Sequence, residues 1–365
     1  MKKRVIFTIF VVIVISIFLS ILFHISKIKN NGMSDDINAD VNISSSEESL
    51  INIVPTVLDE ATDNSAWCAT FQLVWNDMKN ELVKQDVVFN PQLEMVENLN
   101  KETFTENMIS DEYYYKKWGY KNLEIKEEIE KGIDEKFSQK SDILDKINWE
   151  GGKGEEYIFY SMLYRKFEYL KEFDSIENGI FKDRQDVESF GLVDSTDNSV
   201  GNQIDVLYYK SNDDFAILIN TKDGDEVIFN KNPKGNNFKE IYDNMMKQSE
   251  KFDGKTSFSD MDRFMAPKIN FNELRKYNEL INKPFMTANG EIIEISEAMQ
   301  TIKFTLDEKG GEIKSEAALT TLKSAMLTEE PRDFYLDDTF AIFLKEEDKD
   351  FPYFAAKIDD ISLFQ

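Results

Sequence analysis

Residues 299–334 read MQTIKFTLDEKGGEIKSEAALTTLKSAMLTEEPRDF. The first eight, Met299–Leu306, alternate as a β-strand does, and Phe340–Leu344 (FAIFL) is typical of a second strand. A hairpin needs only two to five residues between its strands, yet more than twenty small and polar residues stand between these two. A connection of this length is usually a working loop or a disordered one. The sequence therefore directs attention to the segment that begins at Asp307.

Side chains after Gly310 alternate in a way that suits a strand inside a sheet. One parity is uncharged: Gly311, Ile313, Ser315, Ala317, Leu319 and Thr321. The other parity carries three charges, on Glu312, Lys314 and Glu316. A slip by one residue would turn these charges inward, and each would cost several kcal/mol. The pattern predicts that this segment can enter a half-buried sheet in one register only.

Composition excludes several classes of function. The net charge of −26 makes a solvated acidic surface that repels phosphate backbones, so we expect no nucleic-acid binding. The only cysteine, Cys68, lies in an apolar pattern (SAWCATFQLVW) typical of a buried position, and the only histidine is His24. Ser-His-Asp, Cys-His and histidine-zinc chemistry are therefore not expected. No motif singles out a carboxylate pair for hydrolysis, and we expect no enzyme, cofactor or metal.

The amino-terminal segment has the features of a membrane anchor. Val5–Phe23 is an uncharged run of 19 residues that follows Lys2, Lys3 and Arg4. This length spans a bilayer, and the positive cluster favours a cytoplasmic amino terminus. We expect an uncleaved signal-anchor in residues 1–29, an acidic Ser/Asn-rich tether in 30–60 and one extracellular, monomeric domain in 61–365. Cleavage of the segment would instead give a secreted protein. High Asn, Lys and Ile content and scarce cysteine are typical of a bacterial surface protein.

Elements along the remaining chain indicate an α+β fold. Helical spacing dominates the first half, and we expect helices at Asn64–Val83, Lys121–Phe137 and Ser141–Asn148. A short strand followed by a helix is expected over Val87–Asn100. Strands dominate the second half, with a hairpin from Ile204–Tyr209 to Phe215–Asn220 and further strands at Met265–Phe271 and Tyr353–Ile358.

Five stretches occur in an order that resembles the serpin superfamily. They are VVFNPQLEM, QIDVLYYKSNDDFAILIN, MAPKINF, SEAMQTIKFTLDEKG and LDDTFAIFLKEEDKDFPYFAAKI. The last two resemble the strand before the reactive loop and the carboxyl-terminal strand pair. Asn90, Leu93 and Gln300 replace the residues that the family has at its shutter, so the chain resembles a remote or degenerate member. The resemblance implies N-terminal helices packed on large, mostly antiparallel sheets, with a long exposed reactive-type loop.

The resemblance also implies a function and its residues. Serpins trap serine or cysteine proteases as suicide substrates, so loop 307–333 is expected to be bait for a target protease. The expected hinge residues are Glu308, Lys309, Gly310, Gly311, Ser315, Ala317 and Ala318. The expected scissile window is Lys323, Ser324, Ala325, Met326, Leu327 and Thr328. Lys323 would suit a trypsin-like protease, and Met326 or Leu327 a chymotrypsin- or subtilisin-like one.

One feature of the hinge favours a different function. Ile313, Lys314 and Glu316 are larger than the small residues that the family prefers there, and bulk slows insertion. If insertion is slower than deacylation, the protein is a substrate and not an inhibitor. The alternative is a non-inhibitory, serpin-fold surface protein that serves as a binding or structural module.

Overall fold

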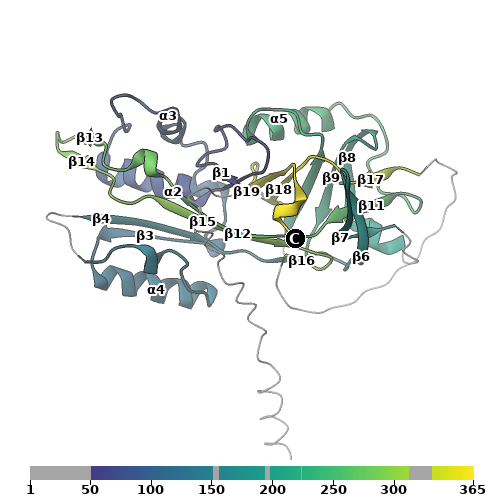
Figure 1. Cartoon of the computed structure of the whole chain (residues 1–365), viewed down its shortest axis with the longest axis horizontal. Helices are drawn as coiled ribbons and strands as arrows, with labels where there is room; N and C mark the ends of the chain where they lie inside the picture. Colours follow the sequence, from purple (N-terminus) through teal and green to yellow (C-terminus); the bar gives the residue numbers. More distant parts are fainter. Residues whose placement is uncertain (1–50, 151–155, 194–197, 223, 312–330) are drawn as a thin grey trace, which may run out of the picture. The chain divides into compact units, whose positions relative to one another are not determined.

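The computed structural model describes residues 51–150, 156–193, 198–222, 224–311 and 331–365. Its largest sheet has seven strands in the order β1-β2-β19-β18-β10-β9-β8 (Figure 1). Their bounds are Asn52–Ile53, Ser65–Cys68, Phe354–Ile358, Phe340–Glu346, Asp225–Lys231, Asp214–Asn220 and Ile204–Ser211. All neighbours pair antiparallel except β1 and β2, which run parallel. The expected hairpin and carboxyl-terminal strand pair are therefore confirmed as β8–β9 and β18–β19.

Both faces of the central strands are covered, which explains their continuous apolar sequence. On one face, Phe343 of β18 contacts Phe238 and Tyr242 of helix α5 (Phe238–Ser249). On the other face, Phe229 of β10 packs against Phe264 of a second sheet. That four-stranded sheet has the order β17-β11-β7-β6, with bounds Asp333–Tyr335, Arg263–Pro267, Arg184–Leu192 and Asp174–Phe181. These two interfaces place the main hydrophobic core on the two sides of one sheet.

A further layer consists of two separate antiparallel pairs. Strand β3 (Tyr114–Tyr120) pairs with β4 (Tyr157–Leu163), and β12 (Ile269–Lys276) pairs with β15 (Met299–Leu306). Short strand β5 (Phe167–Glu168) follows β4, and β16 (Gly310–Gly311) turns back beside the end of β15 through the Asp307–Gly310 bridge and pairs with β5. A small hairpin is formed by β13 (Pro284–Met286) and β14 (Ile292–Glu294).

Helix α4 (Leu123–Phe137) lies along the β3–β4 pair (Figure 1). Its buried residues Ile125, Ile129 and Ile133 recur every four positions and share a hydrophobic cluster with Ile158 and Tyr160 of β4. The helix begins where the Asn122 side chain accepts a hydrogen bond from the Ile125 amide at 2.8 Å. The predicted helix in this region is confirmed, and it covers one face of the pair.

Three predicted elements were wrong in part. The stretch Asn64–Val83 begins with strand β2, and only Thr70–Asp77 is the α-helix α2, followed by a π-helix at Met78–Val83. Ser141–Asn148 contains a single 3-10 turn, Leu144–Lys146. Val87–Phe89 is not a strand, although helix α3 follows at Glu94–Asn100. In addition, Met265–Phe271 divides into β11 and β12 at Lys268. Backbone partners distant in sequence decide these cases, as β19 does for β2.

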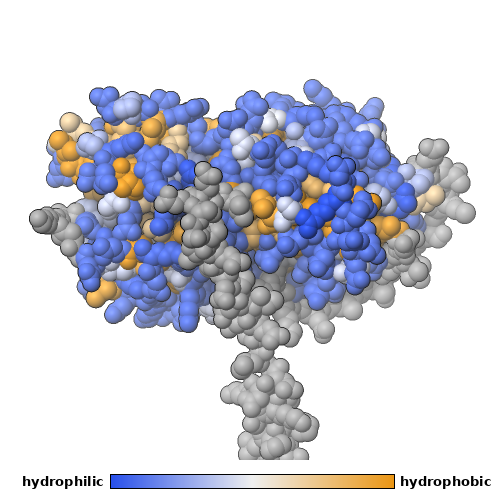
Figure 2. Space-filling model, in the orientation of Figure 1, coloured by the Kyte–Doolittle hydropathy of each residue, from blue (hydrophilic) through white to orange (hydrophobic). Residues whose placement is uncertain are grey.

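Figure 2 shows a mainly hydrophilic face on which hydrophobic groups are scattered. Among the described residues, no helix is both long and apolar enough to cross a membrane, and the predicted anchor at residues 5–23 lies outside them.

Candidate functional site

The upstream root of the loop is fixed to the fold by main-chain and charged contacts. The carbonyl oxygens of Glu308 and Lys309 accept hydrogen bonds from the amides of Phe173 (2.9 Å) and Tyr169 (3.0 Å). The Glu308 carboxylate pairs with Lys268 at 2.6 Å. Burial alone would raise the pKa of Glu308, but the hydrogen bonds from Lys268 and from the main chain outweigh it and lower the pKa. The first two predicted hinge residues therefore hold the start of the loop in place.

The two predicted hinge glycines pack closely against neighbouring strands. Gly310 has a φ of +128°, and a Cβ built there would lie 2.4 Å from the Phe167 carbonyl oxygen. At Gly311 a Cβ would lie 3.0 Å from the Phe167 ring and 3.1 Å from the Thr305 oxygen. The φ of Gly310 is readily adopted by glycine and is strained for other residues. These positions therefore let β16 approach β5 closely enough to pair.

Paired arginine and aspartate residues fix the downstream root. Arg332 donates from Nη2 to Asp262 at 2.7 Å and to the Ser257 oxygen at 2.8 Å, and from Nη1 to the Lys255 oxygen at 2.8 Å. On the neighbouring strand, Arg263 binds the Asp333 carboxylate through two hydrogen bonds of 2.7 Å. Planar two-bond pairs of this type are strong and specific. Sequence reasoning missed this clamp, because its four residues become partners only when β11 and β17 align.

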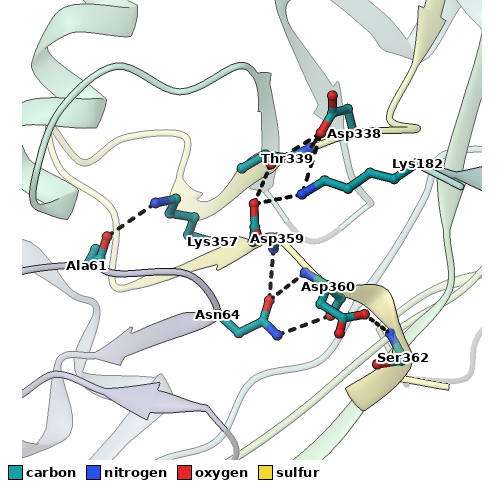
Figure 3. A network of polar contacts seen from close by, with 9 residues as sticks. All are labelled: Ala61, Asn64, Lys182, Asp338, Thr339, Lys357, Asp359, Asp360 and Ser362. Atoms are coloured by element: carbon teal, nitrogen blue, oxygen red, sulfur yellow. Dashed lines mark hydrogen bonds and ion pairs between the residues drawn. The ribbon is translucent and has the colours of Figure 1, made fainter.

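A polar network behind the downstream root ties the end of the chain to the fold (Figure 3). Asp359 accepts hydrogen bonds from Lys182 at 2.8 Å and from the Thr339 hydroxyl at 2.6 Å. These two donors, Lys182 first, lower the pKa of Asp359. The Asn64 side chain accepts from the amides of Asp359 and Asp360 at 2.8 and 3.0 Å. Residues 331–365 are thus attached to the fold independently of the loop that precedes them.

Between the two roots, strands β4 and β15 each pair on one side only. In the described part of the chain, β4 has a ladder with β3 and β15 with β12, and no ladder joins β4 to β15. Among the residues that the structure describes, strand pairing connects the two pairs only through β5 and β16, which run antiparallel to each other. Each inner edge therefore carries main-chain N–H and C=O groups without a strand partner. The loop leaves β16 at the point where these two edges meet.

Gln300, which replaces a residue that serpins have at the shutter, is 4% exposed, and its side-chain amide forms three hydrogen bonds. It accepts a hydrogen bond from the Tyr277 hydroxyl at 2.8 Å and donates to the Thr70 hydroxyl at 2.9 Å and the Cys68 oxygen at 3.1 Å. Because Cys68 ends β2 and Thr70 begins α2, the amide links β15 to both elements. The other two departures, Asn90 and Leu93, precede α3.

Cys68, the one cysteine of the described residues, lies at the end of β2. Burial raises the pKa of the Cys68 thiol, which disfavours a nucleophilic thiolate. No group of three acidic, cysteine or histidine side chains that could hold a metal ion occurs among the described residues. The predicted residues Ser315, Ala317 and Ala318 and the window Lys323–Thr328 lie outside the residues that the structure describes.

Comparisons with known proteins gave structural matches only. No family model matches the chain, and no curated protein matches it. A thyroxine-binding globulin in complex with thyroxine is 13% identical, with 81% of this chain and 92% of that chain covered and a TM-score of 0.46. Tengpin, a thermophilic serpin in its native state, is 12% identical, with 83% and 90% covered and a TM-score of 0.47. Serpin48 of the insect Tenebrio molitor is 15% identical, with 73% and 71% covered and a TM-score of 0.39. Two of these three solved structures are named as serpins.

Proposed function

We propose that this chain is a membrane-anchored, extracellular serpin-like protein whose loop 307–333 is bait for a serine or cysteine protease. One observation carries the proposal: among the described residues, β4 and β15 each have no strand partner on the inner edge, and the loop starts at β16, which turns back beside β15 and pairs with β5. A long loop beside two unpaired strand edges is a segment that can become a strand.

The direction of the strands fits such an insertion. Because β16 turns back antiparallel to β15 and pairs antiparallel with β5, which follows β4, strands β4 and β15 run in the same direction. A loop that continues in the direction of β16 would lie between these strands and run antiparallel to both. It would pair with both edges and satisfy their main-chain groups. The uncharged parity that begins at Gly311 would then face inward.

The chemistry of the trap belongs to the protease. Its serine or cysteine would attack a carbonyl carbon in the window Lys323–Thr328, form an acyl bond and release the downstream amine. The downstream part, residues 331–365, would stay with the fold through the Arg332 and Arg263 pairs. The upstream part would be free to insert with the protease attached. This chain supplies the substrate bond, the hinge and the site of insertion.

Incubation with trypsin-like, subtilisin-like and papain-like proteases tests the proposal. We expect a complex that survives SDS and migrates at the summed mass of protease and cleaved chain, since an ester or thioester joins them. A protease whose nucleophile has been blocked beforehand is the control, and it should give no such band. Complete cleavage by every protease without a stable band would contradict inhibition.

The alternative, a non-inhibitory binding or structural protein, has its own support. Residues Ile313, Lys314 and Glu316 place bulk and charge in the hinge, and α4 buries three isoleucines against the β3–β4 pair that insertion would disturb. Both features would slow insertion of the loop, and a protease is trapped only if insertion is faster than deacylation. This alternative expects clean cleavage and unchanged stability of the cut chain.

Anchoring by residues 5–23 is a separate part of the proposal. We expect the full chain to remain in the membrane fraction after washing at high pH and to partition into detergent, because an uncharged run of 19 residues is long enough to span a bilayer. A variant with Ile13 and Ser16 changed to Lys should leave the membrane fraction. Release of the unaltered chain by the wash, or shortening of its amino terminus, would contradict an uncleaved anchor.

A further inference from the structure

A cluster of buried charges lies where the chain leaves β4. The side chains of Arg165, Asp225 and Glu346 are 3%, 0% and 4% exposed. The Arg165 Nε donates a hydrogen bond to Asp225, and its Nη1 lies 3.4 Å from Glu346. Arg165 stands between β4 and β5, Asp225 begins β10 and Glu346 ends β18. The cluster therefore joins the β3–β4 pair to the seven-stranded sheet.

The cluster contains two carboxyl groups and one guanidinium. The other groups in contact with the carboxylates are neutral: the Tyr353 hydroxyl donates to Asp225 at 3.0 Å, and the Ser110 amide and hydroxyl donate to Glu346 at 2.9 and 2.5 Å. Lys345, the neighbour of Glu346, instead pairs with Glu226 at 2.7 Å. In the described part of the chain, one buried negative charge thus remains without a cation, which is costly in a low-dielectric interior.

Arg165, Glu346, Tyr113 and Ser110 line an open cavity of about 490 Å³ beside the cluster. Its remaining charged lining is acidic, from Glu112, Glu347 and Asp348. The Tyr113 ring covers the guanidinium at 3.4 Å and carries no charge. The surroundings therefore add negative potential and no further positive charge, and both conditions favour uptake of a proton.

We propose that the Arg165–Asp225–Glu346 cluster binds one additional proton in mildly acidic solution and thereby strengthens the junction between β4 and the seven-stranded sheet. This property goes beyond protease trapping and does not depend on it. The described residues contain no histidine, so a carboxyl group of this kind is the available means of sensing mild acid.

The direction of the effect follows from Asp225. Burial raises its pKa from 3.8 to about 6, and the charge and hydrogen bond of Arg165 oppose this only in part. The folded chain therefore holds a proton at pH values where the unfolded chain has lost it. Stability is gained as the pH falls through about 6 toward the unfolded value of 3.8 and is lost again as the pH rises.

Thermal unfolding of the full chain between about pH 7.5 and about pH 4.5 tests the proposal, because a pKa shift of this size corresponds to a rise of roughly 5 °C on acidification. Asp225→Asn should be more stable than the wild type at neutral pH and should lack this part of the rise. An asparagine amide can donate to the Tyr353 oxygen while its carbonyl accepts from Arg165. Asp134→Asn, the same charge change at an exposed position of α4, should keep the rise.

A second variant covers the case in which Asp225→Asn does not fold. Tyr353→Phe removes the hydroxyl that stabilises the ionised carboxylate, so the midpoint of the pH-dependent rise should move to higher pH. A purely structural role for Tyr353 would lower stability at every pH and leave the midpoint in place. An unshifted midpoint in this variant, or an unchanged rise in a folded Asp225→Asn variant, would overturn the proposal.

Discussion

A single cut inside Lys323–Thr328 is expected to raise the melting temperature by about 15 °C. An inserted strand of about eight residues forms roughly 15 main-chain hydrogen bonds at about 1 kcal/mol each. Ordering its backbone costs roughly 1 kcal/mol per residue. The remaining gain is about 7 kcal/mol, and each kcal/mol corresponds to about 2 °C in a domain of this size. Most mutations and cleavages lower stability, so a rise would be diagnostic of insertion.

The measurement compares melting curves of the intact and cut chains, with the cut bond located by mass spectrometry. Cleavage within residues 30–50, upstream of β1, is a matched control that breaks one bond and provides no strand, and it should leave the melting temperature unchanged. If the loop-cut chain melts at the same temperature as the intact one, the trap proposal fails and the non-inhibitory alternative stands.

Replacing Ala317 with arginine should abolish that rise, whereas the same change at Ala318 should preserve it. The two residues are adjacent and identical in type, and they belong to opposite parities of the predicted strand. In the register that turns the uncharged side chains inward, Ala317 would face the core. An unpaired guanidinium at that position costs several kcal/mol, which offsets most of the free energy gained by insertion. Ala318 turns outward with Glu312, Lys314 and Glu316.

The readouts are the melting temperature after cleavage and the yield of the SDS-stable complex. Ala317→Arg is expected to be cleaved as fast as the wild type and to form no complex, because the substrate bond is unchanged while insertion is blocked. Ala318→Arg serves as its control. Equal behaviour of the two variants would show that the parity assigned to the loop is wrong.

Local patterns predicted those elements whose partners are close in the sequence. The hairpin β8–β9 was predicted because two alternating runs flank a short polar turn. Helix α4 was predicted because Lys121–Phe137 has helical spacing with a charged outer face. Ser65–Cys68 was assigned to a helix because its apolar spacing continues into α2. Its strand state depends on β19, which lies at the other end of the chain.

The residues of the candidate site also differ in whether the sequence could predict them. Glu308, Lys309, Gly310 and Gly311 were identified from the motif before the loop, and the structure places all four at its root. The Arg332–Asp262 and Arg263–Asp333 pairs carry no sequence signal, since surface arginines and aspartates are common. The charge cluster around Asp225 could not be predicted either, because its three members come from distant elements.

The sequence by itself determined the α+β class and the long connection between β15 and β18, and it predicted a single register for that connection. Each of these depends on residue type and on spacing along one segment, which the chain carries whether or not it is folded. Only the tertiary structure decided that β4 and β15 stay unpaired with each other, that both loop roots are clamped, and that two buried carboxyl groups share one guanidinium. Those features depend on hydrogen bonds and charges brought together from distant segments, and their energies exist only once the strands are packed.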